Sequence, residues 1–118
     1  MADFRQQILR GTLDLLVLQA VRAKPAHGYA IARWVEGATG DALRIEDGSL
    51  YPALYRLEER GLIEAEWRLT DDRRRAKYYT LTAAGRKRLR EETASWTKYA
   101  RAIFAALDIP ITVQPAGA

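Results

Sequence analysis

The sequence contains no cysteine and a single histidine, His27. Without cysteine the chain can form neither a disulfide nor a thiolate metal site, and one histidine cannot supply a histidine cluster. We therefore expect no metal ion and no other cofactor. Long apolar runs are also lacking: no stretch approaches the roughly 20 apolar residues of a membrane helix, and none follows the N-terminal residues 1–5. These absences predict a soluble, cytoplasmic protein.

Groups that could converge on a substrate are missing as well. The acidic pairs Glu58–Glu59, Asp71–Asp72 and Glu91–Glu92 are sequence neighbours, and such neighbours point apart on a helix or turn. His27 stands before Gly28, as in a turn, without an evident acid, thiol or hydroxyl partner. Because no nucleophile, base and oxyanion site come together, the sequence predicts a protein that is not an enzyme.

Acidic residues are absent from one long segment, which begins at Arg73 and ends at Arg90. All 15 Asp and Glu residues of the 118-residue chain lie outside it. Its eight basic residues are Arg73, Arg74, Arg75, Lys77, Arg86, Lys87, Arg88 and Arg90. Positive charge focused in this way is typical of a surface that binds a polyanion such as nucleic acid.

Three segments have apolar residues at spacings of three and four, the pattern of helices that bury one side. The predicted helices extend from Ile8 to Val21, from Ile31 through Trp34 and Val35 to Ala38, and from Leu50 through Leu54 to Leu57, with Gly40 and Gly61 after the second and third. The chain is long enough for one small hydrophobic core and an accessory element. We assign the three leucines of the third helix to that core.

The periodicity then changes to two. Apolar residues alternate with charged ones from Ile63 to Leu69, and a polar turn and a second strand, 77–81, follow. Because two strands alone are marginally stable, we expect the hairpin to pack on the helices through Trp67, Tyr79 and Leu81. Three helices followed by such a hairpin predict a winged helix-turn-helix, in the α+β, mostly α, fold class.

A final helix is expected from Thr82, whose hydroxyl caps it, to about Leu107, ahead of Pro110. Residues at the a/d spacing of a coiled coil run along it: Leu89, Thr93, Trp96, Ala100, Ile103 and Leu107. We predict that this seam joins two copies in a two-fold homodimer; the alternative is a helix that folds back on its own domain. The predicted organisation is a winged helix-turn-helix domain (1–81), a dimerisation helix (82–107) and a loosely ordered tail (108–118).

Four segments of residues 11–85 follow one another with characteristic spacing. They are Gly11-Thr12-Leu13-Asp14-Leu15-Leu16-Val17-Leu18, His27-Gly28-Tyr29-Ala30-Ile31, Gly48-Ser49-Leu50-Tyr51-Pro52-Ala53-Leu54 with Leu57 and Gly61, and Arg75-Ala76-Lys77-Tyr78-Tyr79-Thr80-Leu81-Thr82 with Gly85. In them the chain resembles the PadR family of bacterial transcriptional regulators, in particular its short members with one C-terminal helix. The resemblance implies a DNA-binding regulator, expected to repress, that dimerises through the C-terminal helix and often through the first helix.

Candidate DNA-binding residues follow from what winged helices do. The third helix reaches base edges in the major groove, and its first amides bind phosphate; the candidates there are Ser49, Tyr51, Pro52, Tyr55 and Arg56. For both tyrosines the alternative is partial burial against the first helix or the hairpin. The wing candidates are Arg73, Arg74, Arg75 and Lys77, which we expect either to straddle the neighbouring minor groove or to clamp its phosphates; the alternative is a solvated run of charge. Arg86, Lys87, Arg88 and Arg90 carry less weight, as the solvated side of the last helix.

The predicted partner is double-stranded DNA, bound by a homodimer at an inverted repeat with half-sites roughly 34 Å apart. Trp96 lies on the seam, where paired aromatic rings either pack the dimer or also hold a small planar effector. A second alternative is a winged-helix adaptor that binds acidic protein partners and has no DNA sequence preference.

Overall fold

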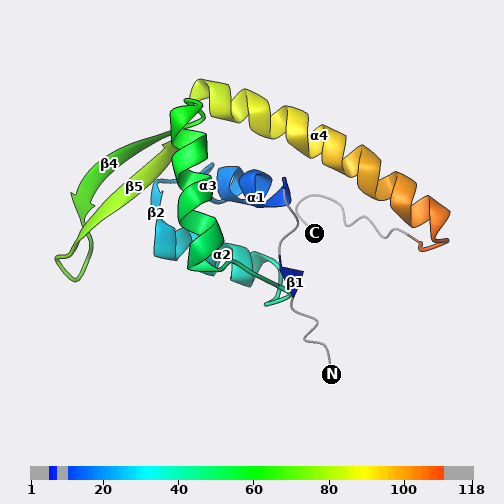
Figure 1. Cartoon of the computed structure of the whole chain (residues 1–118), viewed down its shortest axis with the longest axis horizontal. Helices are drawn as coiled ribbons and strands as arrows, with labels where there is room; N and C mark the ends of the chain where they lie inside the picture. The colour runs from blue at the N-terminus through cyan, green and yellow to red at the C-terminus, as the bar shows by residue number, and fades with distance from the viewer. Residues whose placement is uncertain (1–5, 8–10, 111–118) are drawn as a thin grey trace.

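The computed structural model describes residues 6–7 and 11–110. Within these residues the chain forms four helices and five strands (Figure 1). The helices are α1 (Thr12–Ala20), α2 (Gly28–Ala38), α3 (Asp47–Glu59) and α4 (Ala83–Ala106), and the strands are β1 (Gln6–Gln7), β2 (Ala26–His27), β3 (Leu43–Arg44), β4 (Ile63–Leu69) and β5 (Arg75–Leu81). The order of elements confirms the predicted winged helix-turn-helix.

The core lies where α1, α2 and α3 meet. Leu50, Leu54 and Leu57 of α3 are each 1% exposed, which confirms their assignment to the core. The first helix is shorter than predicted, because α1 begins only at Thr12, after Gly11 with its φ of 96°. Ile8 and Leu9, which we expected inside that helix, lie outside the described residues, as does the end of the predicted tail, 111–118.

The predicted apolar stripe of α2 is only partly correct. Ile31 and Val35 are fully buried, but Trp34 is 41% exposed and Ala38 is exposed, because the core covers a narrower side of the helix than the spacing indicated. The start of α2 depends on His27, whose Nδ1 accepts a hydrogen bond from the Ala30 amide at 3.2 Å. His27 therefore serves as an N-cap, which satisfies one of the first amides of the helix.

The predicted two-stranded hairpin is a three-stranded antiparallel sheet in the order β2-β5-β4. Strands β4 and β5 pair from Ile63 opposite Leu81 to Leu69 opposite Arg75, as expected. The additional strand, β2, is two residues long and pairs with the base of β5. A second short pairing joins β1 and β3 in parallel. The sheet is thus tied to the chain segment that precedes α2.

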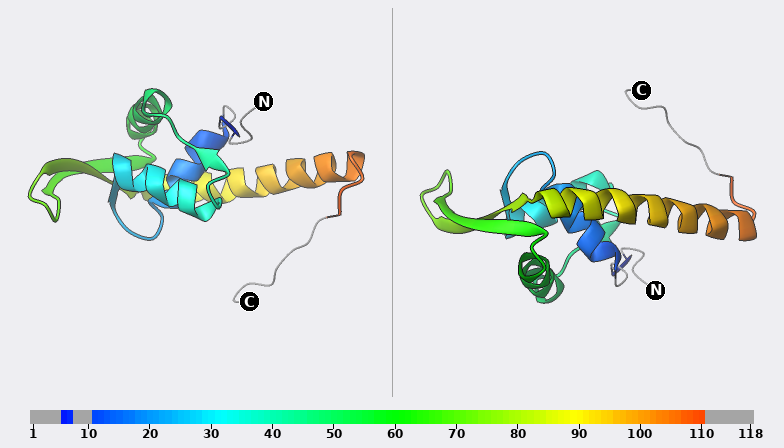
Figure 2. Two further views of the ribbon diagram at one scale, coloured as in Figure 1. Left: turned by 90° about the horizontal axis from the view of Figure 1, so that it is seen from below. Right: turned by 90° about the horizontal axis from the view of Figure 1, so that it is seen from above.

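The β4–β5 hairpin, which we call the wing (63–81), is buried only at its base. Tyr79 and Leu81 pack in the core as predicted. Trp67 is 57% and Leu69 is 66% exposed, so the expectation that the hairpin packs through Trp67 is wrong. These two side chains stay exposed because the outer half of the hairpin projects beyond the helices that could cover it (Figures 1 and 2).

Helix α4 begins as predicted, with the Thr82 hydroxyl accepting from the Gly85 amide at 2.9 Å. Leu89, predicted for the dimer seam, is instead buried in the core of its own subunit, so the first turns of α4 complete the winged domain. Beyond that point α4 extends past the other elements, in the direction opposite to the wing (Figure 2). No helix in the described ranges is long and apolar enough to span a membrane.

Candidate nucleic-acid interface

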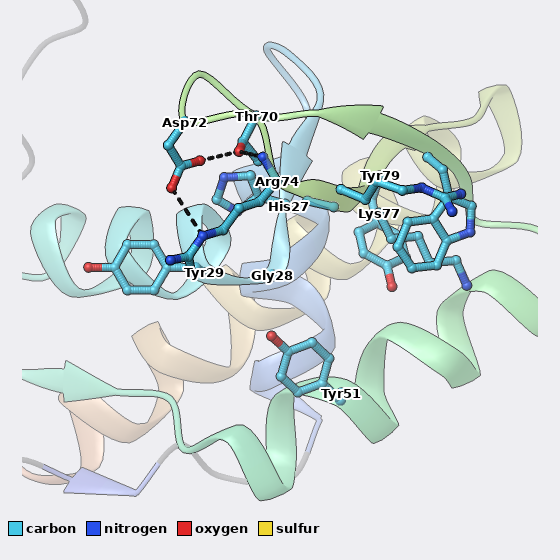
Figure 3. A pocket seen from close by; sticks show the side chains of 12 residues that line it. His27, Gly28, Tyr29, Tyr51, Thr70, Asp72, Arg74, Lys77 and Tyr79 are labelled. Carbon is cyan, nitrogen blue, oxygen red and sulfur yellow. Dashed lines mark hydrogen bonds and ion pairs between the residues drawn. The ribbon is translucent and has the colours of Figure 1, made fainter.

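An open hollow of about 810 Å³ lies between the wing and the helices α2 and α3 (Figure 3). Its lining comes from three places: Tyr51 on α3; His27, Gly28 and Tyr29 at the start of α2; and Trp67, Thr70, Asp72, Arg74, Arg75, Ala76, Lys77 and Tyr79 on the wing. The hollow therefore brings together candidates that the sequence placed in two separate groups. His27 and Tyr29 belong to the segment His27-Gly28-Tyr29-Ala30-Ile31 of the PadR resemblance, but the sequence does not predict either of them at the interface.

The exposed side of α3 carries all five of its candidates. Tyr51 is 52% and Tyr55 is 64% exposed, so neither ring is buried in the core and both remain candidates for contact with DNA. Tyr51 faces the wing, whereas Arg56 faces α1, where its Nη2 lies 3.2 Å from Asp14 Oδ1. The helical spacing leaves Pro52 and Tyr55 between these two edges and places Ser49 beside Arg56.

Tyr51 rests on the first turn of α2 (Figure 3). A Cβ atom added to Gly28 would lie 3.0 Å from both the hydroxyl oxygen and Cε1 of Tyr51. The absence of a side chain at Gly28 thus lets the ring lie against the backbone. Because a tyrosine held by such a contact loses little conformational freedom on binding, Tyr51 can present its hydroxyl with a small entropic penalty.

The N-terminus of α3 differs from the phosphate site that we expected there. Glu46 is its N-cap residue and Asp47 lies in its first turn. The amide of Ser49 already donates to the Glu46 carbonyl oxygen at 2.9 Å. Two carboxylates and an occupied amide disfavour a phosphate at this helix end, whereas carboxylates accept hydrogen bonds from cytosine amino groups in the major groove.

The tip of the wing is held by a local network around Thr70. The Thr70 amide donates to the Arg74 carbonyl oxygen at 2.7 Å, and the Thr70 side-chain oxygen accepts from the Arg74 amide at 3.1 Å. Arg73 has a φ of 63°, a left-handed conformation that this tight turn imposes. The Arg74 side chain is 84% exposed and lies 3.5 Å from Asp72 (Figure 3). The network presents Arg73 and Arg74 to solvent at the end of the hairpin.

Lys77 has a different environment from the arginines of the wing. Its Nζ lies 3.1 Å from Glu58 Oε1 on α3, and this hydrogen bond raises the pKa of Lys77. The pair joins the wing to α3 across the hollow. Of the four predicted wing cations, Lys77 is therefore the one whose charge is most fully neutralised by a neighbouring helix.

The four basic residues at the start of α4, Arg86, Lys87, Arg88 and Arg90, lie away from this hollow. Arg88 pairs with Glu92 one helical turn later at 3.6 Å, while Arg86 and Arg90 line a second groove, between α1 and α4, with Leu15 and Leu16. The continuous basic segment of the sequence is thus divided between two surfaces. Trp96 lies beyond both, 45% exposed on the projecting part of α4.

Comparison with known proteins places this geometry in a family. The chain matches the Transcriptional regulator PadR-like family over residues 17–91, from α1 into α4. A transcriptional regulator of Mycobacterium tuberculosis is 32% identical over 99 residues, which cover 84% of this chain and 89% of the relative. The structure resembles that of a PadR family transcriptional regulator from Eggerthella lenta, with a TM-score of 0.69, 36% identity and 86% of each chain covered.

A transcriptional regulator from Clostridium thermocellum has a similar structure, with a TM-score of 0.73 and 26% identity over 80% of this chain and 91% of that chain. The family model and these likenesses agree with the winged helix-turn-helix seen here. They also agree with the absence of converging catalytic groups in the sequence, since the family consists of regulators. The chain therefore belongs to the PadR-like family of transcriptional regulators, whose members bind DNA.

Proposed function

We propose that this protein represses transcription by binding an inverted-repeat operator as a homodimer, with α3 in the major groove and the wing at the adjacent minor groove. One observation carries the proposal: Tyr51 on the exposed side of α3 and two arginines of the wing, Arg74 and Arg75, line the same open hollow. A polyanion lying along this side would meet both elements at once. Occupation of a promoter by such a dimer would exclude other proteins from it.

Helix α3 has the dimensions that a major groove accepts. Its 13 residues span roughly 20 Å at 1.5 Å per residue, and its leucines are all turned into the core. Pro52 and Tyr55 would therefore approach the base edges most directly, with Tyr51 on one side of them and Arg56 and Ser49 on the other. We propose that these five side chains read the operator, in the manner of a recognition helix.

The wing supplies charge rather than sequence recognition. Arg73 and Arg74 at its tip are exposed, and contacts from such side chains to phosphate position a protein without reading bases. Lys77 contributes chiefly by fixing the wing to α3 through Glu58. We thus propose that α3 determines the DNA sequence specificity and that the wing arginines supply much of the binding affinity for DNA.

Dimerisation is proposed through the part of α4 that projects from the domain. Trp96, Ile103 and Leu107 are exposed large apolar residues on this stretch, and they share one side of the helix at coiled-coil spacing. Within a single subunit this apolar strip has nothing to cover it along the described chain. A second copy of α4 would bury it on both sides of a two-fold axis.

Replacement of Ile103 by glutamate is expected to convert the dimer into a monomer at micromolar concentration. The carboxylates of two copies would face each other across the axis in an apolar seam, where burial of charge is strongly unfavourable. Sedimentation velocity would measure the change. As a matched control, Arg101→Glu places the same residue two positions away on the opposite side of α4 and should leave the dimer intact. A dimer that survives Ile103→Glu would exclude this seam as the interface.

Selection from a random duplex DNA library at near-physiological salt tests the proposed function directly. We expect enrichment of an inverted repeat whose half-sites are about one helical turn apart, roughly 34 Å between centres. A reporter gene placed behind the recovered sequence should fall in expression when the protein is present. Binding that enriches no sequence and disappears as salt rises would instead indicate a generic polyanion surface, as in a winged-helix adaptor.

A further inference from the structure

The outer half of the wing carries an exposed tryptophan, Trp67, whose presence is not explained by packing within the subunit. Trp67 is 57% exposed, although tryptophan is among the residues that gain most from burial. It lines the hollow together with Tyr51, Arg74 and Arg75. We infer that Trp67 positions Arg75 for its contact with DNA, an inference that rests on the proposed function and assigns a specific role within it.

The register of the wing places the two residues together. Trp67 is paired with Lys77, and its neighbour Leu69 is paired with Arg75. Since side chains alternate along a strand, all four project from the same side of the hairpin, the side whose base is buried. The guanidinium carbon of Arg75 lies 5.1 Å from the centre of the Trp67 ring. This distance is within the range of an attractive cation–π contact.

A cation–π contact of this kind restricts Arg75 without using its hydrogen-bond donors. A guanidinium group that lies on an aromatic ring contacts it through its flat face, and its N–H groups, which lie in the plane, stay available to phosphate oxygens or base edges. Arginine otherwise has a long, mobile side chain whose ordering opposes binding. The ring of Trp67 thus prepares Arg75 for binding, which explains why an apolar side chain is exposed there.

The opposite side of the wing provides an internal comparison. Arg68 lies 5.5 Å from the ring of Tyr78, so it makes a similar contact on the same hairpin. Its guanidinium is also 3.1 Å from Glu66, and neither Arg68 nor Tyr78 lines the hollow. Arg68 therefore offers a matched control, with the same charge and a similar aromatic contact on the side of the wing that faces away from α3.

A double-mutant cycle with the selected duplex tests the inference. Affinities of the unmodified protein, Trp67→Ala, Arg75→Ala and the double variant would be measured by fluorescence anisotropy at 0.15 M salt and over a salt series. Loss of one phosphate contact per subunit predicts that Arg75→Ala weakens binding on the order of 30-fold and lowers the slope of log affinity against log salt by about 2. Trp67→Ala should weaken binding roughly fivefold through two cation–π contacts. In the Arg75→Ala background Trp67→Ala should have almost no further effect.

Two further variants distinguish an effect of Trp67 on the position of Arg75 from a general effect on the structure of the wing. Trp67→Phe keeps an aromatic ring and should restore affinity to within about twofold of the unmodified protein. Arg68→Ala removes an equal charge and should have a much smaller effect than Arg75→Ala. Should Trp67→Ala fail to fold, Trp67→Thr, which favours a strand, takes its place in the cycle.

The outcomes that overturn the inference are distinct. Equal losses from Trp67→Ala in both backgrounds would mean that Trp67 contacts DNA independently of Arg75. An Arg75→Ala variant that binds the selected duplex with unchanged affinity would exclude the role of Arg75 while leaving the proposed function in place. If the unmodified protein selected no DNA sequence, the inference and the proposed function would both fail.

Discussion

Replacement of Gly85 by alanine is expected to destabilise the fold by roughly 3 kcal/mol or more, at the upper end of the penalty for overpacking. A Cβ atom at this position would lie 2.0 Å from the backbone carbonyl oxygen of Leu62 and 2.7 Å from Leu81 Cδ1. The Leu62 oxygen also accepts from the Thr82 amide at 3.2 Å, so it cannot move without loss of that bond. The first turn of α4 would have to separate from the turn that precedes β4.

Urea denaturation at a fixed protein concentration would measure this change in the free energy of unfolding. For a domain with a total stability of about 5–15 kcal/mol the loss is a large fraction, and the melting temperature should fall by roughly 10 °C or more. Gly37→Ala is the matched control, because a Cβ atom there meets nothing within 4 Å. Within α2 that change should stabilise by about 0.5–1 kcal/mol through helix propensity. Equal effects of both substitutions would contradict the close contact at Gly85.

Simultaneous replacement of Arg73, Arg74 and Arg75 by alanine should lower the affinity for the selected operator by about four orders of magnitude at 0.15 M salt. If each arginine contacts one phosphate in each subunit of a dimer, the slope of log affinity against log salt should fall by about 5. The loss should affect specific and non-specific duplexes alike, because phosphate contacts carry no sequence information. Anisotropy titrations over a range of salt concentrations would provide both quantities.

A second triple variant distinguishes the position of the charges from their number. Arg86, Lys87 and Arg90 replaced by alanine remove the same charge from α4, outside the hollow. This variant should weaken binding by less than about tenfold, through the long-range field alone. Its oligomeric state would be checked first, because Arg86 and Arg90 line the groove beside α1. Equal losses from the two triple variants would refute a specific role for the wing.

Much of the fold could be predicted because its determinants are local in the sequence. The leucines of α3 repeat at helical spacing, and the Thr82 cap and the Gly61 turn act within a few residues of themselves. Periodicity indicates which residues share a side, however, and not whether another element covers that side. For this reason the spacing predicts burial of Trp34 and Trp67, although the structure leaves both exposed.

The sequence predicts individual residues of the candidate site, but it does not predict the ion pairs that join them. The ion pair of Lys77 with Glu58 joins residues 19 apart in the sequence, and that of Arg56 with Asp14 joins residues 42 apart. No local pattern contains such distances. Leu89 illustrates the same point on α4, because its coiled-coil spacing agrees with a seam, but the core of its own subunit already buries it.

Because Leu89 is buried, α4 is fixed to the winged domain near its N-terminal end, and its far end can move when the helix rotates about that point. The helix is anchored to the winged domain at this residue, and from there to Leu107 it extends about 27 Å at 1.5 Å per residue. A rotation of about 7° around the anchor would displace the far end by about 3.4 Å, the axial rise of one base pair. In the proposed dimer, small changes in the angle of α4 would thus shift the two recognition helices between operator spacings that differ by a single base pair.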